Sequence, residues 1–146
     1  MPYTSDTEIE HIARGLIDRT LPLAEWTHAA HFAAALWLIA EDRAAAHANM
    51  PGMIRAYNEA SGGGNSDTEG YHETITQASL GAAHSLLSKA AAGTPLHVVL
   101  RDLMASEYGK STWLMTYWSK PVLFSVEARR GWVGPDLKPL PFDVQA

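Results

Sequence analysis

Two short segments of the sequence carry side chains that can bind a metal ion or transfer a proton. In the first segment, His28 and His31 are three positions apart, so they lie on one face if the segment is a helix. In the second segment, His72 is followed directly by Glu73. Imidazoles and carboxylates are metal ligands and also act as acids and bases. We therefore expect these four residues to form the functional site.

The residue types in this set predict a metal centre. Cysteine is absent from the chain, which leaves imidazole and carboxylate as the strong ligands available. His28 and His31 stand at the start of the most apolar stretch of the sequence, where a polar group without a partner costs roughly 1–3 kcal/mol. A divalent metal ion held by His28, His31 and His72 satisfies one nitrogen of each ring. This ligand set suits zinc, iron, nickel, copper or manganese.

Glu73 has two alternative roles in such a centre. Three protein ligands leave one coordination position open, as in catalytic metal sites. Glu73 then serves either as a fourth ligand or as the general base for a metal-bound water. Both versions predict a metal-dependent hydrolase, or a related enzyme, that acts on a small molecule.

Two other functions use the same residues without a metal ion. In one, the histidines hydrogen-bond a polar ligand inside an apolar pocket, and the chain is a small-molecule-binding protein. In the other, the histidines are structural, and the aromatic C-terminal third of the chain mediates self-association as a homodimer. A stoichiometric metal ion would favour the enzyme over both alternatives.

Further residues are candidates for ligand binding, and they are Tyr71, Thr76, Arg55 and Asn58. Tyr71 and Thr76 belong to the segment that carries His72 and Glu73. Arg55 and Asn58 can line a polar pocket. A run of three glycines at 62–64 precedes a predicted helix start, which is a natural position for an anion. This run lacks the Gly-Lys-Ser/Thr ending of a phosphate-binding loop. We interpret it as a flexible connection beside the site.

Helices must position these residues, and apolar periodicity predicts helices along most of the chain. We expect them over approximately these ranges: 6–19, 24–42, 43–49, 53–60, 66–92, 95–106, 111–118 and 121–130. Ser66 and Glu69 match a capping box, so the helix that carries His72 begins there and His72 faces inward. From Gly131 onward, three prolines exclude a regular helix.

The predicted fold class is therefore all-α. We expect a single-domain bundle of about six to seven helices over residues 1–146. An extended, proline-rich tail over residues 131–146 packs on this bundle.

The composition limits the functions that the chain can have. Hydrophobic residues make up 47% and charged residues 18% of the chain, which is the balance of a folded domain. The formal net charge is −5 and the basic residues are scattered, so we expect no nucleic-acid partner. The N-terminal residues do not resemble a signal peptide, and the longest apolar run is too short to span a membrane. We expect a cytoplasmic protein without a membrane partner.

Five segments carry a resemblance to a protein family, and they are 26–31, 70–74, 117–119, 123–125 and 135–140. On these segments, above all the WTHxxH and GYHET motifs, the chain resembles a family of uncharacterised bacterial proteins. The similarity extends over nearly the whole chain. This family has no established activity, so the resemblance implies no catalytic role for any residue.

Overall fold

The computed structural model describes residues 3–144, which form helices and no strand. The α-helices are α1 (Asp6–Asp18), α2 (His28–Glu41), α3 (Arg43–Ala60), α4 (Glu73–Lys89), α5 (Leu96–Ala105), α6 (Lys120–Leu123) and α7 (Val126–Arg130). Three short 3₁₀ helices join them: η1 (Leu23–Glu25), η2 (Glu107–Gly109) and η3 (Trp113–Thr116). The prediction of an all-α fold is confirmed. The outermost ends of the predicted domain 1–146 and of the predicted tail 131–146 lie outside the described residues.

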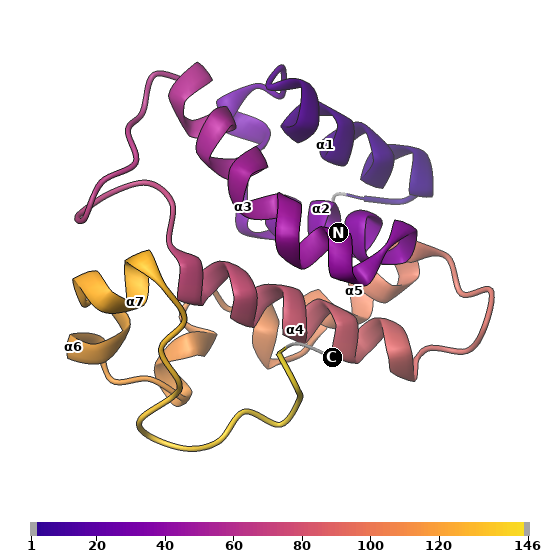
Figure 1. Ribbon diagram of the computed structural model, residues 1–146. Coiled ribbons are helices and arrows are strands. Elements are labelled where there is room, and N and C mark those ends of the chain that lie inside the picture. Colours follow the sequence, from indigo (N-terminus) through magenta and orange to yellow (C-terminus); the bar gives the residue numbers. More distant parts are fainter. Residues whose placement is uncertain (1–2, 145–146) are drawn as a thin grey trace.

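The apolar helix α2 lies in the core of the molecule. It packs against α1, α3, α4 and α5, and Phe32 and Leu36 are 1% and 0% exposed. The alanines at 33–35 are also buried, and their small side chains let neighbouring helices approach closely. In Figure 1, α4 runs below α3, and α6 and α7 lie beside the N-terminal end of α4. None of the helices between residues 3 and 144 is long and apolar enough to cross a membrane.

The helix α2 begins later than the sequence pattern predicts. It starts at His28 and not near residue 24, because residues 23–25 form the separate 3₁₀ helix η1. Thr27 is the N-cap, and its side-chain oxygen accepts a hydrogen bond from the backbone N–H of Ala30 at 3.2 Å. His28 is therefore the first residue of α2, at the N-terminal end of this helix.

The predicted separation of the helices 43–49 and 53–60, with Pro51 between them, is wrong. Helix α3 continues through Pro51 to Ala60. A proline inside a helix removes one backbone hydrogen bond, and here both Pro51 and its neighbour Met50 are buried in the core. The chain turns instead at Asp42, whose carboxylate accepts a hydrogen bond from the backbone N–H of Ala45 at 3.1 Å and caps α3.

The helix that carries the second predicted site also begins later than expected. The capping-box contact forms, since Ser66 Oγ accepts a hydrogen bond from the backbone N–H of Glu69 at 3.3 Å, but it closes only a local turn. Gly70 then adopts a φ of +81°, and a Cβ atom there would lie 2.0 Å from the carbonyl oxygen of Gly64. Helix α4 therefore starts at Glu73, and His72 is its N-cap.

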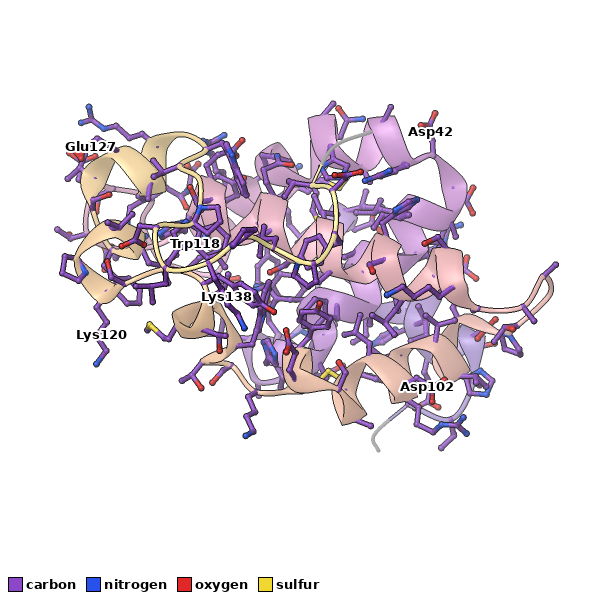
Figure 2. All side chains as sticks on the ribbon, turned by 90° about the horizontal axis from the view of Figure 1, so that it is seen from below. Asp42, Asp102, Trp118, Lys120, Glu127 and Lys138 are labelled. Atoms are coloured by element: carbon purple, nitrogen blue, oxygen red, sulfur yellow. The ribbon has the colours of Figure 1, made fainter. Side chains whose placement is uncertain are left out.

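Residues 131–144 form no helix or strand, and they contact α4 and residues 117–119. The indole N–H of Trp118 donates a hydrogen bond to the carbonyl of Val133 at 2.9 Å, and the N–H of Val133 donates one to Thr74 Oγ1 on α4 at 3.0 Å. In Figure 2, Trp118 lies beside this segment, whereas Lys120 points away from it. Trp118 is 0% exposed, so the segment covers a large core side chain.

Candidate functional site

A cleft lies between α2, α4 and η3, and two of the predicted histidines line it. Its volume is about 330 Å³. The lining residues are His28, His31, Phe32, Ile75, Ser79, Ser111, Trp113 and Leu114. A narrow extension of about 40 Å³ reaches α3 and shares His31, Ile75 and Ser79 with the cleft. The spacing of His28 and His31 thus places both rings on one mainly apolar wall.

The ring of His28 is held by a backbone carbonyl from a distant segment. Its Nε2 lies 2.8 Å from the carbonyl oxygen of Tyr108. Because a carbonyl only accepts, Nε2 carries the hydrogen, and the neutral ring has its lone pair on Nδ1. This Nδ1 has no hydrogen-bond partner among residues 3–144. His28 therefore offers one free acceptor nitrogen.

The ring of His31 is held in the same way, but by its other nitrogen. Its Nδ1 donates to the carbonyl of Thr27 at 2.8 Å, and the ring stacks on Trp26 with 3.8 Å between centroids. Burial lowers the pKa of His31, the hydrogen bond to Thr27 opposes this effect, and the neighbouring His28 lowers the pKa further. The ring is thus neutral near pH 7. Its Nε2 lone pair has no partner in the described part of the chain.

The third predicted metal ligand, His72, does not line this cleft. It is 6% exposed, and both of its ring nitrogens already form hydrogen bonds. Its Nδ1 accepts from the backbone N–H of Ile75 at 3.2 Å, and its Nε2 donates to the carbonyl of Leu123 at 2.7 Å. Burial lowers the pKa of His72, and the charge of Arg129 adds to this effect, although the hydrogen bond to Leu123 opposes it. The neutral ring that both bonds require is therefore favoured.

Glu73 belongs to a chain of polar side chains that does not include His72. The hydroxyl of Tyr71 donates to Glu73 Oε1, and the side-chain amide of Gln77 donates to Glu73 Oε2 at 3.3 Å. The same amide donates to the carbonyl of His47 at 3.1 Å, while His47 Nδ1 donates to Gln77 Oε1 at 2.6 Å. Burial raises the pKa of Tyr71, and the hydrogen bond to Glu73 raises it further. Tyr71 is therefore a protonated donor.

The predicted metal ligands are thus only partly brought together. His28 and His31 share a cleft and each keeps one free nitrogen, whereas His72 and Glu73 are engaged elsewhere. Between residues 3 and 144, no group of three or more His, Cys, Asp or Glu side chains is arranged to hold a metal ion. The three-histidine centre stays a prediction. The cleft contributes two possible ligands to such a centre, the free nitrogens of His28 and His31.

The predicted ligand-binding residues lie in three different places. Thr76 lines the narrow extension of the cleft. Tyr71 and Arg55 line a separate polar pocket. Asn58 donates a hydrogen bond from its side-chain amide to Asn65 Oδ1 at 3.0 Å, so it holds the loop that precedes α4.

Three polar residues of the cleft were not among the predicted site residues. Ser79 lies one helical turn beyond Ile75, on the predicted inner face of its helix, so periodicity gave a signal for it. Ser111 and Trp113 reach the cleft only through the fold of the chain, and no local pattern marks them. Trp113 is 3% exposed, and its indole N–H has no hydrogen-bond partner within the described residues. A residue that lines the cleft thus has a buried, unpaired donor.

The aromatic C-terminal third is mainly core. Trp113, Tyr117 and Trp118 are at most 3% exposed. Phe124 and Trp132, by contrast, are 51% and 42% exposed. The homodimer stays a prediction, and its interface would have to include these two exposed rings.

A second hollow lies along the outer face of α1, with a volume of about 360 Å³. Glu10 and Arg14 on its wall pair with each other at 2.7 Å and are largely exposed. Because Glu10 and Arg14 already pair with each other, we regard it as a surface groove.

No protein-family model, curated protein or solved structure matches this chain. The resemblance to a bacterial family stays a prediction. A function has to be inferred from the cleft itself.

Proposed function

We propose that the protein binds a small, mainly apolar molecule that carries a hydrogen-bond donor, and that it does so without a metal ion. One observation carries this proposal: two free acceptor nitrogens, His28 Nδ1 and His31 Nε2, belong to rings that line one apolar cleft. Each ring donates to a backbone carbonyl at 2.8 Å, which sets its tautomer before any ligand arrives. A hydroxyl, amine or amide N–H of a ligand fits such acceptors.

The size and lining of the cleft support a ligand of this kind. Its volume of about 330 Å³ is at the lower end of the range for small-molecule sites, roughly 300–1,000 Å³. Phe32 and Leu114 provide apolar walls, and Ser79 adds a hydroxyl.

Phenol and toluene are matched probes for this proposal, because they differ by one hydroxyl group. In an NMR titration, phenol should shift the amide signals of α2 and η3 saturably. Toluene should bind roughly two- to tenfold more weakly, since a net hydrogen bond contributes about 0.5–1.5 kcal/mol. The variant His31→Phe keeps the stacking on Trp26 but removes one of the two free nitrogens, so it should reduce the preference for phenol over toluene.

The matched control is His11→Phe, because His11 is exposed and lies outside the cleft. This variant should keep the preference for phenol. Equal binding of phenol and toluene to the unmodified protein would contradict the proposal. An unchanged preference in His31→Phe would contradict the role of its Nε2.

Metal binding is the second candidate function, and the same two lone pairs favour it. An ion on His28 and His31 would be completed by water or substrate, and a metal-bound water would support the hydrolase prediction. Elemental analysis of untagged protein distinguishes the candidates. A stoichiometric metal ion that is lost in His28→Ala and kept in His72→Ala would support a two-histidine centre. Loss in His72→Ala as well would support the three-histidine centre, and equal metal content in all variants would exclude both.

A further inference from the structure

Three arginines converge on one small pocket of an otherwise acidic protein. The pocket has a volume of about 160 Å³, and Arg55, Arg129 and Arg130 line it. They come from α3 and α7, which are far apart in the sequence. The whole chain has a formal net charge of −5, so this cluster of positive side chains is opposite in sign to the net charge of the protein.

Arg55 forms no ion pair with a carboxylate within residues 3–144. Its guanidinium lies over the ring of Tyr71, 4.3 Å from the centroid, and it forms no side-chain hydrogen bond within residues 3–144. The contact with the aromatic face fixes the guanidinium plane at the pocket wall. The N–H groups along its edge remain available to a ligand.

Arg129 is held in place by backbone and not by an acidic side chain. Its Nη1 donates to the carbonyls of Gly70 and Tyr71 at 3.1 and 3.2 Å. Its Nε is buried and has no partner in the described part of the chain. Neutral carbonyls leave the full positive charge of Arg129 at the pocket.

Arg130 already holds a carboxylate of the chain itself at the pocket. Its Nε and Nη2 each donate to one oxygen of Asp67 at 2.8 Å, which is the paired geometry that guanidinium groups form with carboxylates and phosphates. Asp67 is the only acidic residue that lines the pocket in the described chain. Among the lining residues, three arginines and one aspartate leave two net positive charges. Glu59 lies outside this lining and accepts a hydrogen bond from Asn65 Nδ2 at 3.1 Å.

The loop that closes the pocket is rigidly built. Asn65 Oδ1 accepts hydrogen bonds from the side chain of Asn58 and the backbone N–H of Tyr71, both at 3.0 Å. Asn65 Nδ2 donates to the carbonyl of Arg55 at 3.0 Å. This one side chain therefore ties the loop to α3 and to the start of α4. The arginines converge on a preformed wall.

We propose that this pocket binds an oxyanion, either a phosphate group or a carboxylate, between Arg55, Arg129 and Arg130. The volume suits a single anionic group, which would be a free anion or the charged end of a larger ligand. Phosphate satisfies several guanidinium N–H groups at once and carries more charge than a carboxylate, so it should bind more tightly.

The test is a titration with inorganic phosphate and, separately, with acetate, at constant ionic strength and followed by NMR. Phosphate should shift the signals of residues 65–71 and of α7 saturably, and acetate should bind more weakly. The variant Arg55→Gln should weaken phosphate binding about tenfold or more. Arg55→Lys keeps the charge but loses the planar contact with Tyr71, so its affinity should be intermediate.

Two further variants make the result specific. Arg101→Gln is the matched control, since Arg101 is an exposed arginine on α5 that pairs with its neighbour Asp102, and it should not change binding. Asp67→Asn frees Arg130 and removes the competing carboxylate, so it should raise the phosphate affinity several-fold. His31→Phe should leave phosphate binding unchanged, which separates this pocket from the cleft.

Phosphate shifts that do not saturate, or that are equal in Arg55→Gln and Arg101→Gln, would overturn the proposal. So would a loss of affinity in Asp67→Asn. Tighter binding of acetate than of phosphate would assign the pocket to carboxylate ligands. Arg129 is left unchanged in these tests because it supports the backbone at Gly70 and Tyr71.

Discussion

His72 joins two elements through its two ring nitrogens, as the N-cap of α4 and as a donor to the carbonyl of Leu123. We expect His72→Ala to lower the free energy of unfolding by about 1–3 kcal/mol, because a capping bond is lost and two buried backbone groups lose their partner. Asparagine is a good N-cap residue, so His72→Asn should recover part of this loss. Urea denaturation followed by circular dichroism measures both variants. An unchanged stability of His72→Ala would show that the ring does not cap α4.

Buried histidines also make the stability depend on pH. Burial lowers the pKa of His31, His72 and His84, so the folded chain binds fewer protons than the unfolded chain just below the ordinary histidine pKa of about 6.5. The stabilisation is therefore present above that value and is lost as the pH falls through it. We expect the free energy of unfolding to decrease from about pH 7 to about pH 5, and His72→Asn should show a shallower decrease. A flat stability profile in this window would contradict the prediction.

At the scale of elements, two helix glycines test how closely the C-terminal segment packs on α4. Replacing a glycine inside a helix by alanine adds about 1 kcal/mol of helix propensity. At Gly52 in α3, a Cβ atom would meet nothing within 4 Å, so Gly52→Ala should stabilise the protein by about that amount. At Gly81 in α4, a Cβ atom would lie 2.7 Å from Phe142 and 3.1 Å from the Cα of Val144. Gly81→Ala should therefore destabilise the protein in thermal unfolding. Equal stabilisation by both substitutions would mean that the segment does not pack tightly there.

The ends of helices were harder to predict than the helices themselves, and this affected the prediction of the site at His72. Ser66 and Glu69 form their capping contact, yet the positive φ of Gly70 ends that turn. A local pattern predicts the contact but not whether a helix follows it. His72 is buried, as expected, but it is the N-cap of α4 and not a residue within the helix. Its bond to the carbonyl of Leu123, 51 positions away, has no local signal at all.

By contrast, the pairing of the first two histidines depends only on local geometry. His28 and His31 are three positions apart on α2, and both line the cleft. The residues that complete the cleft, such as Trp113, come from a segment that only the tertiary fold brings near. Spacing can therefore predict one wall of this cleft but not the groups that face it.

At the scale of the whole molecule, the segment after α7 holds together parts that are distant in the sequence. The backbone N–H of Leu137 donates to the carbonyl of Tyr117 at 2.9 Å, and that of Ser119 donates to Asp136 Oδ1 at 2.8 Å. We expect truncation after Arg130 to lower the melting temperature measurably, because Trp118, which is 0% exposed, loses its cover and its hydrogen-bond acceptor. Differential scanning calorimetry measures the loss. No change on truncation would show that the segment does not contribute to stability.

The segment after α7 also contacts residues that form the cleft. Phe142 lies edge-on to Tyr108, with ring centroids 5.9 Å apart, and 6.4 Å from Trp113. Tyr108 provides the carbonyl that fixes His28, and Trp113 lines the cleft. Phe142→Ala should therefore weaken phenol binding in addition to destabilising the fold.

The exposed Leu137, which is 55% accessible, provides the matched control on the same segment. Leu137→Ala should leave phenol binding unchanged, because its side chain lies on the surface and outside the cleft. Both affinities are measured by NMR titration well below the melting temperature of each variant, so that unfolded protein does not contribute. If Phe142→Ala bound phenol as tightly as Leu137→Ala, the cleft would be independent of the C-terminal segment, and Tyr108 and Trp113 would hold their positions without Phe142.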